Sequence, residues 1–304
     1  MKTGYVGLGR MGKNMVLRLL EQSIEVVAWN RSPGPVEEMV KAGAVGAESL
    51  EDLIKKLEVP RIVWLMLPAG EVTDEYIDEL LPLLSPGDLI VDGANSFYKD
   101  TLRRAEKIKP TGIHFMDIGV SGGPGGARTG ACMMIGGAKE DVDRIMGVVK
   151  AASAPQAFGH FGEVGSGHFA KMVHNGIEYG MMEAIGEGAA MLKYGPFKLD
   201  LAEVFRVYQH RSVIESRLVG WTQEALTDAP DLAEISSEIK STGEGEWTVK
   251  IAKELGIQTP VIEDSFKVRQ NSANDPEDSP EGFRNKVVSA QRGKFGQHPV
   301  KKEL

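Results

Sequence analysis

Four polar side chains recur at helical spacing within residues 167–180, GHFAKMVHNGIEYG. Lys171, His174, Asn175 and Glu178 lie three and four positions apart, so a helix would place them on one side. An amine, an imidazole, an amide and a carboxyl differ from the Glu and Lys that usually fill a solvated helix face. The pattern therefore favours a functional face, with a plain solvated face as the alternative.

These groups suit proton transfer at a hydroxyl-bearing carbon. A lysine held away from water can act as a general base, and hydride transfer from such a carbon to a nicotinamide needs a base on the hydroxyl. Gly176 and Gly180 interrupt the same helix at a cost of about 1 kcal/mol each, which indicates the close approach of another group. We therefore expect an active-site helix here.

Two loops offer further polar groups. Asn95 ends the apolar run DLIVDGAN, and the stretch GVSGGPGGARTG contains Ser121, Gly122 and Gly123. We expect a glycine-rich turn in the second stretch, because its backbone N–H groups could bind a carboxylate. A flexible loop is the alternative there.

Charge restricts the class of ligand. The chain has 304 residues and a net charge of -8, which disfavours a nucleic-acid partner because that requires a basic surface. A few local cations can still bind a small anion. Arg269 and, in the tail, Arg292 and His298 are candidate anion ligands, although single residues of these types are more often plain surface.

A glycine fingerprint near the N-terminus indicates a dinucleotide. Gly7, Gly9 and Gly12 form a G-x-G-x-x-G pattern between an expected strand and an expected helix. The first glycine permits a tight turn, the second lets the backbone approach a pyrophosphate, and the third allows close packing of helix and strand. An unliganded turn is the alternative. The residues expected to contact the cofactor here are Gly7, Leu8, Gly9, Arg10, Met11 and Gly12.

The end of the second expected strand favours NADP over NAD. Asn30, Arg31 and Ser32 stand where an NAD site usually has a carboxylate. Arg31 can pair with a 2′-phosphate, and its neighbours can donate hydrogen bonds; a surface arginine is the alternative. The loop MLPAG, which ends the next buried strand, adds Leu67, Pro68 and Ala69 as cofactor contacts at the carboxyl edge of the sheet, where Asn95 is also expected.

Hydrophobic patterning separates two domains. Up to residue 163, nearly continuous apolar runs alternate with helical patterns, which predicts an α/β domain of Rossmann type with a doubly wound parallel sheet. From residue 164 the pattern is helical, beginning with one long helix that ends at Gly195. We expect an NADP-binding domain over 1–163 and an all-α substrate domain with a tail over 164–304.

Several classes of protein are excluded or disfavoured. Cys132 is the single cysteine, so neither a disulfide within the chain nor a cysteine-based metal site is expected. The apolar stretches are too short to cross a bilayer, and the N-terminus lacks the pattern of a secretory signal. We expect a cytoplasmic protein with no metal and no membrane partner.

The motifs together resemble those of the 6-phosphogluconate dehydrogenases, in their short-chain form within the β-hydroxyacid dehydrogenases. The resemblance spans nearly the whole chain. It rests on GLGRMG, NRS, MLPAG, DGANSFYKD, GVSGGPGGARTG, GHFAKMVHNGIEYG, GEGEWTV and RGKFGQH. It implies NADP-dependent oxidative decarboxylation of 6-phosphogluconate to ribulose 5-phosphate and CO2.

The resemblance also implies roles for single residues. Lys171 would be the general base and Glu178 the acid that protonates C1 of the enediol, while Asn175 and His174 would bind substrate hydroxyls. The substrate ligands would be Asn95, Ser121, Gly122 and Gly123 toward the carboxylate, Tyr179 and Arg269 at the phosphate, and Arg292 and His298 from a tail that reaches a partner subunit of a homodimer or homotetramer.

Three positions depart from the family pattern. Ala94 and Gln297 replace common glycines, and Thr242 stands where long-chain members have a phosphate-binding lysine. The phosphate contacts must therefore differ. The alternatives are an NADP-dependent dehydrogenase of a small 3-hydroxy acid, such as 3-hydroxyisobutyrate or tartronate semialdehyde, and a non-catalytic NADP-binding sensor.

Overall fold

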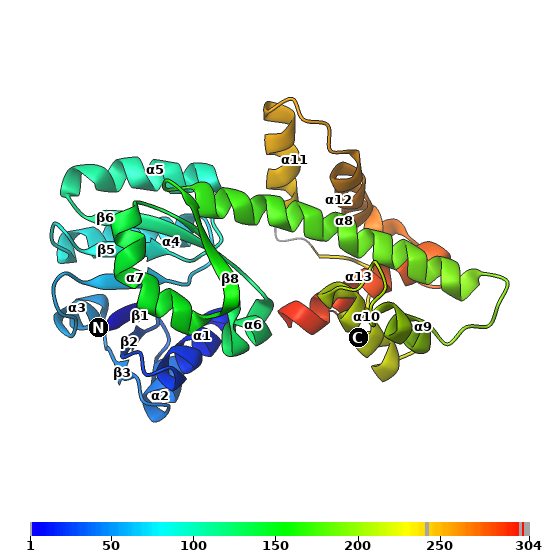
Figure 1. The fold of residues 1–304 in the computed structure, drawn as a ribbon, viewed down its shortest axis with the longest axis horizontal. Helices are drawn as coiled ribbons and strands as arrows, with labels where there is room; N and C mark the ends of the chain where they lie inside the picture. The colour runs from blue at the N-terminus through cyan, green and yellow to red at the C-terminus, as the bar shows by residue number, and fades with distance from the viewer. Residues whose placement is uncertain (1, 241–242, 298–299, 301–304) are drawn as a thin grey trace. The chain divides into compact units, whose positions relative to one another are not determined.

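The computed structural model describes residues 2–240, 243–297 and 300. It divides into two compact units, Met1–Met172 and Val173–Leu304 (Figure 1). The division falls within helix α8 (Ser166–Tyr194), beyond the predicted boundary at residue 163. Lys171 therefore belongs to the first unit, and the polar residues that follow it on α8 belong to the second.

The first unit is built on an eight-stranded sheet in the order β3-β2-β1-β4-β5-β6-β7-β8. Each neighbouring pair is parallel except β6 and β7, which are antiparallel. This confirms the predicted doubly wound fold class, with β7 and β8 running opposite to the other six strands. The strands are β1 Thr3–Val6, β2 Val26–Trp29, β3 Val45–Gly46, β4 Ile62–Leu65, β5 Leu89–Asp92, β6 His114–Ser121, β7 Ala131–Gly136 and β8 Ser153–Gly162.

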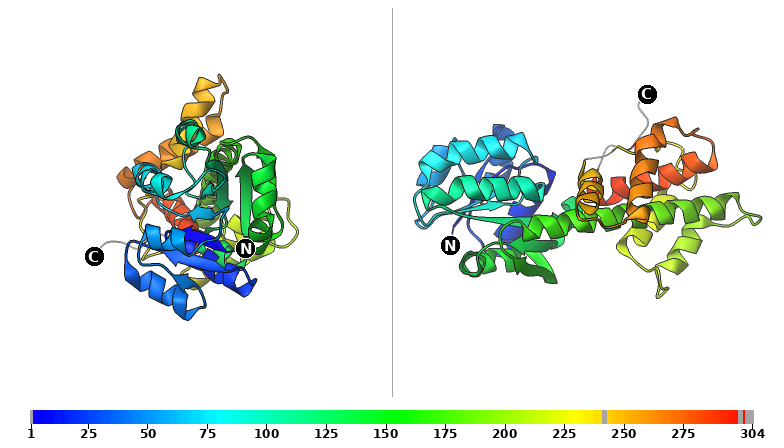
Figure 2. Two further views of the ribbon diagram at one scale, coloured as in Figure 1. Left: turned by 90° about the vertical axis from the view of Figure 1, so that its left-hand side faces the viewer. Right: turned by 90° about the horizontal axis from the view of Figure 1, so that it is seen from above.

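Both faces of this sheet are buried. Tyr5 and Trp64 belong to one apolar cluster, and the adjacent Val6 and Val63 belong to another, because successive side chains point to opposite faces. Helices α1, α2, α6 and α7 pack on the first face and α3, α4 and α5 on the second (Figures 1 and 2). Their bounds are α1 Arg10–Glu21, α2 Pro33–Lys41, α3 Leu50–Lys55, α4 Glu71–Leu80, α5 Tyr98–Ile108, α6 Gly123–Thr129 and α7 Lys139–Ala152, with 3-10 turns at Leu81–Leu83 and Lys109–Thr111.

Two elements of the first unit differ from expectation. The glycine-rich turn after Ser121 is instead the short helix α6, which begins with Pro124 in its first turn and buries Ala127 in the core. Strand β8 has no counterpart in the predicted elements. It pairs with β7 alone at the edge of the sheet and leaves much of its surface exposed, so it lacks the apolar run of a buried strand.

The second unit is helical. Its part of α8 ends at Tyr194, directly before the predicted stop at Gly195. Phe205, Leu226, Phe283 and Val287 form the centre of an apolar cluster. The remaining helices are α9 Leu201–Tyr208, α10 Arg217–Asp228, α11 Glu244–Glu254, α12 Pro260–Asn271 and α13 Pro280–Gly296, with a 3-10 turn at Ser272–Asn274.

Candidate functional site

The three fingerprint glycines have three distinct environments. Gly7 has a φ of +98°, and a side chain there would meet the Met66 carbonyl oxygen at 2.3 Å. A Cβ on Gly12 would lie 2.0 Å from the Gly7 carbonyl oxygen, whereas a Cβ on Gly9 would have nothing within 4 Å. Gly9 is also the residue before the first turn of α1, where backbone N–H groups attract an anion. The geometry thus leaves open space at the position expected to face a pyrophosphate.

Asn30 braces this loop. Its Oδ1 accepts from the Leu8 backbone N–H at 3.0 Å, and its Nδ2 donates to the Ser32 carbonyl at 3.1 Å. Arg31 between them is exposed. The amide of Asn30 is therefore engaged in holding the loop, and Arg31 is the cation that this strand end presents to solvent.

Arg104 joins the next two loops, although it was not among the predicted site residues. Its guanidinium, 1% exposed, contacts the Gly70 carbonyl at 3.0 Å and Asp92 Oδ2 at 3.0 Å. It also donates to Ser96 Oγ at 2.7 Å and Asp74 Oδ1 at 2.7 Å. Its position three residues after buried Thr101 and four before buried Ile108 on α5 is a periodic signal that could have revealed an inward-pointing arginine.

Asn95 is fixed in the same way. Its backbone has a φ of +53°, its Nδ2 donates to the Val120 carbonyl at 3.0 Å, and its Oδ1 accepts from the Val120 N–H at 2.7 Å. Ser121 follows at the end of β6. The side chain of Asn95 thus ties the loop after β5 to the start of the serine–glycine segment, so these two predicted substrate elements lie together.

The polar residues of α8 lie on one continuous helix, as predicted. Lys171 is 7% exposed and Asn175 is 4% exposed, which argues against a solvated face. His174 Nδ1 lies 3.1 Å from Asn175 Oδ1 and 3.7 Å from Glu178 Oε2. An imidazole, an amide and a carboxyl therefore form one contact group within the helix.

Two arginines, from α12 and α13, lie near Tyr179 on the next turn of α8. The Arg269 guanidinium stacks over the Tyr179 ring at 3.5 Å from its centroid, and both side chains are buried. Burial, followed by the neighbouring charge of Arg269, lowers the pKa of the Arg292 guanidinium to about 10. Arg269, Arg292 and Tyr179 of the second unit therefore lie close together. Arg292 neighbours Arg269 of its own chain.

Gly176 and Gly180 mark contacts with neighbouring helices. A Cβ on Gly176 would lie 2.5 Å from Thr248 Cγ2 of α11, and one on Gly180 would lie 3.2 Å from Val261 Cγ1 of α12. The expected close approach is therefore to protein side chains.

Glu183, one turn beyond Tyr179, was also missed. Its Oε1 lies 3.0 Å from Arg284 Nε of α13, and Arg284 also contacts Asp275 at 3.0 Å. Burial raises the pKa of the Glu183 carboxyl to about 7, against the opposing effect of Arg284. A lone Glu in a helix that also carries solvent-facing Glu187 offers no signal of this environment.

The predicted His298 and the departure at Thr242 lie outside the described residues. Among the described residues there is no group of three or more His, Cys, Asp or Glu placed to hold a metal ion. No helix in the described part of the chain is long and apolar enough to cross a membrane.

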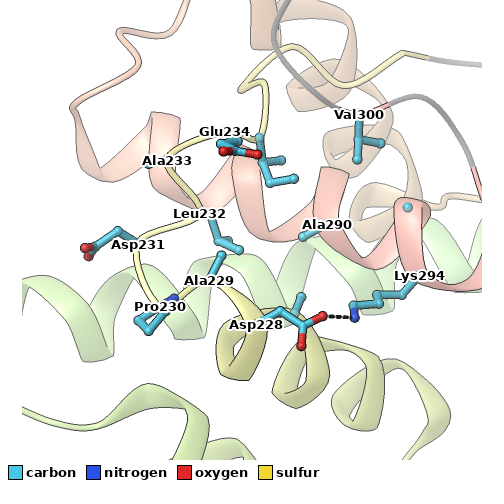
Figure 3. Close-up of a pocket in the computed structure, with 13 residues that line it drawn as sticks. Asp228, Ala229, Pro230, Asp231, Leu232, Ala233, Glu234, Ala290, Lys294 and Val300 are labelled. Atoms are coloured by element: carbon cyan, nitrogen blue, oxygen red, sulfur yellow. Dashed lines mark hydrogen bonds and ion pairs between the residues drawn. The ribbon is translucent and has the colours of Figure 1, made fainter.

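A pocket of about 630 Å³ lies within the second unit (Figure 3). It is bounded by α10, the segment 228–235 and α13, and an ion pair between Lys294 and Asp228 crosses its edge. Because none of the residues expected to bind cofactor or substrate lines it, this pocket is not assigned to the candidate site.

Known proteins resemble both parts of the chain. The family model for the NAD binding domain of 6-phosphogluconate dehydrogenase matches residues 2–165, and the model for the C-terminal domain of 6-phosphogluconate dehydrogenase matches residues 167–279. A decarboxylating, NAD(+)-dependent 6-phosphogluconate dehydrogenase of Haloferax volcanii is 38% identical over 302 residues, covering 99% of this chain and 98% of the relative.

Longer relatives match as well. The NADP(+)-dependent, decarboxylating 6-phosphogluconate dehydrogenase of Bacillus subtilis is 37% identical over 286 residues, which span 89% of this chain and 61% of the relative. The Plasmodium falciparum 6-phosphogluconate dehydrogenase, solved in its apo form and in complexes with NADP+ and with 6-phosphogluconate, has a TM-score of 0.80 at 30% identity and covers 96% of this chain and 70% of that one.

Proposed function

Because the chain belongs to the 6-phosphogluconate dehydrogenase family, we propose that it converts 6-phospho-D-gluconate to D-ribulose 5-phosphate and CO2 with reduction of NADP. The reaction would serve the pentose phosphate pathway or gluconate metabolism. Residues 1–163 would bind the dinucleotide, and residues 164–304 would supply most substrate contacts and a surface for homodimer or homotetramer formation.

Lys171 is the proposed general base. Its neutral amine takes the proton of the substrate 3-hydroxyl while the hydride on C3 leaves for the nicotinamide, which supplies the hydride acceptor when bound. The protonated amine then faces the 3-keto oxygen. It stabilises the negative charge that develops there as the bond between C2 and the C1 carboxylate breaks and CO2 leaves.

Glu178 is the proposed acid. Loss of CO2 leaves an enediol, and Glu178 delivers a proton to the carbon that becomes C1 of the product. His174 and Asn175 bind substrate hydroxyls, and their contact with each other and with Glu178 supports a shared role. A carboxyl beside an imidazole can recover its proton through that neighbour.

The two ends of the substrate need different partners. Ser121, Gly122, Gly123 and Asn95 are proposed to bind the carboxylate end. Tyr179, Arg269 and Arg292 are proposed to bind the phosphate, since two buried guanidiniums side by side are stabilised by an anion between them. These two arginines would bind the phosphate without the lysine that long-chain members have at the position of Thr242. His298 is proposed to reach the site of a neighbouring subunit.

The proposed nucleotide is NADP, supported by Arg31 at the end of β2 and by the absence of a carboxylate from Asn30-Arg31-Ser32. The remaining cofactor contacts are proposed to be Gly7, Leu8, Gly9, Arg10, Met11, Gly12, Asn30, Ser32, Leu67, Pro68, Ala69 and Asn95.

One observation carries the catalytic proposal, namely a buried Lys171 on the same helix as the contact group of His174, Asn175 and Glu178. We expect Lys171→Ala to lose turnover by about 10²- to 10⁴-fold, the usual weight of a general base, while NADP binding measured by calorimetry is unchanged. Near-normal turnover in this variant would contradict the mechanism. A non-catalytic NADP sensor predicts no NADPH formation by the parent protein at all.

A further inference from the structure

One face of strand β6 meets the beginning of helix α8. Asp117 and Gly119 are two residues apart on this strand, so both project from the same face. The Asp117 carboxylate is fully buried. Its two oxygens accept hydrogen bonds of 2.6 Å each from the backbone N–H groups of Gly165 and His168. Gly165 directly precedes α8 and His168 lies in its first turn, where backbone N–H groups have no partner within the helix.

Gly119 contacts the next turn of α8 directly. A Cβ on Gly119 would lie 2.4 Å from Lys171 Cβ, 3.0 Å from Lys171 Cγ and 3.0 Å from the Gly167 carbonyl oxygen. Carbon atoms in contact lie about 3.5–4.0 Å apart. The space beside the stem of Lys171 is thus filled by the bare backbone of β6, and all these residues belong to the first unit.

The helix lies against strand backbone at two successive turns. Gly167 stands four residues before Lys171 and hence on the same helix face. A Cβ on Gly167 would lie 2.4 Å from the Met134 carbonyl oxygen of β7 and 2.8 Å from the Gly136 N–H nitrogen. Backbone is a far stiffer neighbour than a side chain, so these contacts hold this face of the helix at one distance from the sheet.

We propose that Gly119 is a positioning residue for Lys171: the missing side chain on β6, with the Asp117 carboxylate beside it, sets the depth and direction at which the Lys171 amine leaves α8. This inference rests on the catalytic role proposed for Lys171. Gly119 touches neither substrate nor cofactor in this account and acts through the stem of the lysine.

The kinetic test is Gly119→Ala. Gly119 lies in an extended strand and has no positive φ, so the added methyl acts through its contacts and not through backbone strain. Because a methyl must displace Lys171 by about 1 Å, we expect kcat to fall about 10²-fold, with an unchanged KM for NADP. Gly147→Ala is the matched control, since a Cβ there meets nothing within 4 Å. A folded Gly119→Ala variant with the kcat of the parent protein would overturn the proposal.

A double-mutant cycle tests the contact independently of catalysis. Lys171→Gly removes the Cβ that the new methyl would strike, so Gly119→Ala should lower the unfolding midpoint much less in the Lys171→Gly background than in the parent protein. If Gly119→Ala alone is insoluble, the double variant should be soluble. An equal loss in both backgrounds, or an insoluble double variant beside a soluble Lys171→Gly protein, would overturn the contact. A strong coupling between Gly119→Ala and Lys171→Gly in the unfolding midpoint would confirm the contact. If Lys171→Ala nevertheless kept full turnover, the proposed function would be refuted although the contact exists.

Discussion

The amides of Asn30 and Asn95 bond to backbone beside the proposed ligand positions. Asn30 bridges Leu8 and Ser32, and Asn95 is paired with both backbone groups of Val120. Each amide nitrogen carries two hydrogens, and the bond to backbone uses one of them. We therefore propose that nucleotide choice at the strand end depends mainly on the charge of Arg31.

Replacing Arg31 should weaken NADP selectively. A hydrogen bond to a charged group contributes about 1.5–3 kcal/mol, so Arg31→Met should raise the KM for NADP by roughly 10- to 100-fold and leave the KM for NAD unchanged. Arg206→Met is a control, because Arg206 is half-exposed and pairs with Glu203 in the second unit. Initial rates with both nucleotides provide the measurement. A parallel rise in both KM values, or equal use of NAD and NADP by the parent protein, would remove Arg31 as the determinant.

Single residues were predictable from sequence where their type left few options. The glycines at 7, 9 and 12 form a recognisable pattern, and each has a different backbone environment in the structure. Lys171 and Asn175 were singled out by their helical spacing, and both side chains are buried. Arg104 and Glu183 escaped, since an Arg or a Glu in a helix is ordinarily solvated and their buried partners come from distant parts of the chain.

Among the elements, the single helix α8 packs against parts of both units. In the first unit, α8 packs against Gly119 of strand β6. In the second unit, Gly176 of α8 packs against helix α11. The sequence indicated close approach at Gly176 and Gly180 but could not say to what. The answer depends on which helices return to α8, which local spacing does not specify.

Two glycines of α8 should respond oppositely to alanine. Gly188→Ala should stabilise the protein by up to about 1 kcal/mol through helix propensity, because a Cβ there meets nothing within 4 Å. Gly176→Ala gains the same propensity but places a methyl 2.5 Å from Thr248 Cγ2, and overpacking costs about 1–3 kcal/mol. Urea unfolding of the two variants tests this. If the Gly176→Ala protein were as stable as Gly188→Ala, helix α11 would have moved to admit the methyl group without a loss of unfolding free energy.

Elements were predictable when their burial was strong. The long helix and the buried parallel strands follow from continuous patterns. Helix α6 and strand β8 were not anticipated, since α6 is rich in glycine and β8 is a half-exposed edge strand. Both are held in place by neighbours, namely the core around Ala127 and the pairing with β7.

For the whole molecule, Glu183 makes the free energy of unfolding depend on pH. The charges that face it are those of Arg284, Glu187, Arg269 and Asp275. Its pKa of about 7 in the folded protein exceeds the ordinary value of 4.5. Between these two values the folded protein binds the proton more tightly than the unfolded chain does. The free energy of unfolding therefore falls as pH rises through this window and levels off above it.

The Glu183→Gln variant isolates this effect. Relative to the variant, the parent protein should lose up to about 3 kcal/mol of unfolding free energy between pH 4.5 and pH 8, at about 1.4 kcal/mol for each unit of pKa difference. Urea unfolding at four pH values gives both curves. Curves that run parallel across this range would mean that Glu183 titrates as an exposed carboxyl does.

A stoichiometric assay of the purified chain tests whether it is an NADP-dependent 6-phosphogluconate decarboxylase. NADPH formation by absorbance and CO2 release from C1-labelled substrate are followed with 6-phosphogluconate, gluconate and 3-hydroxyisobutyrate, each with NADP and with NAD. We predict one CO2 for each NADPH from 6-phosphogluconate, with NADP preferred and the other two substrates turned over far more slowly. NADPH formation from 3-hydroxyisobutyrate without CO2 release, at a rate above that with 6-phosphogluconate, would contradict the account.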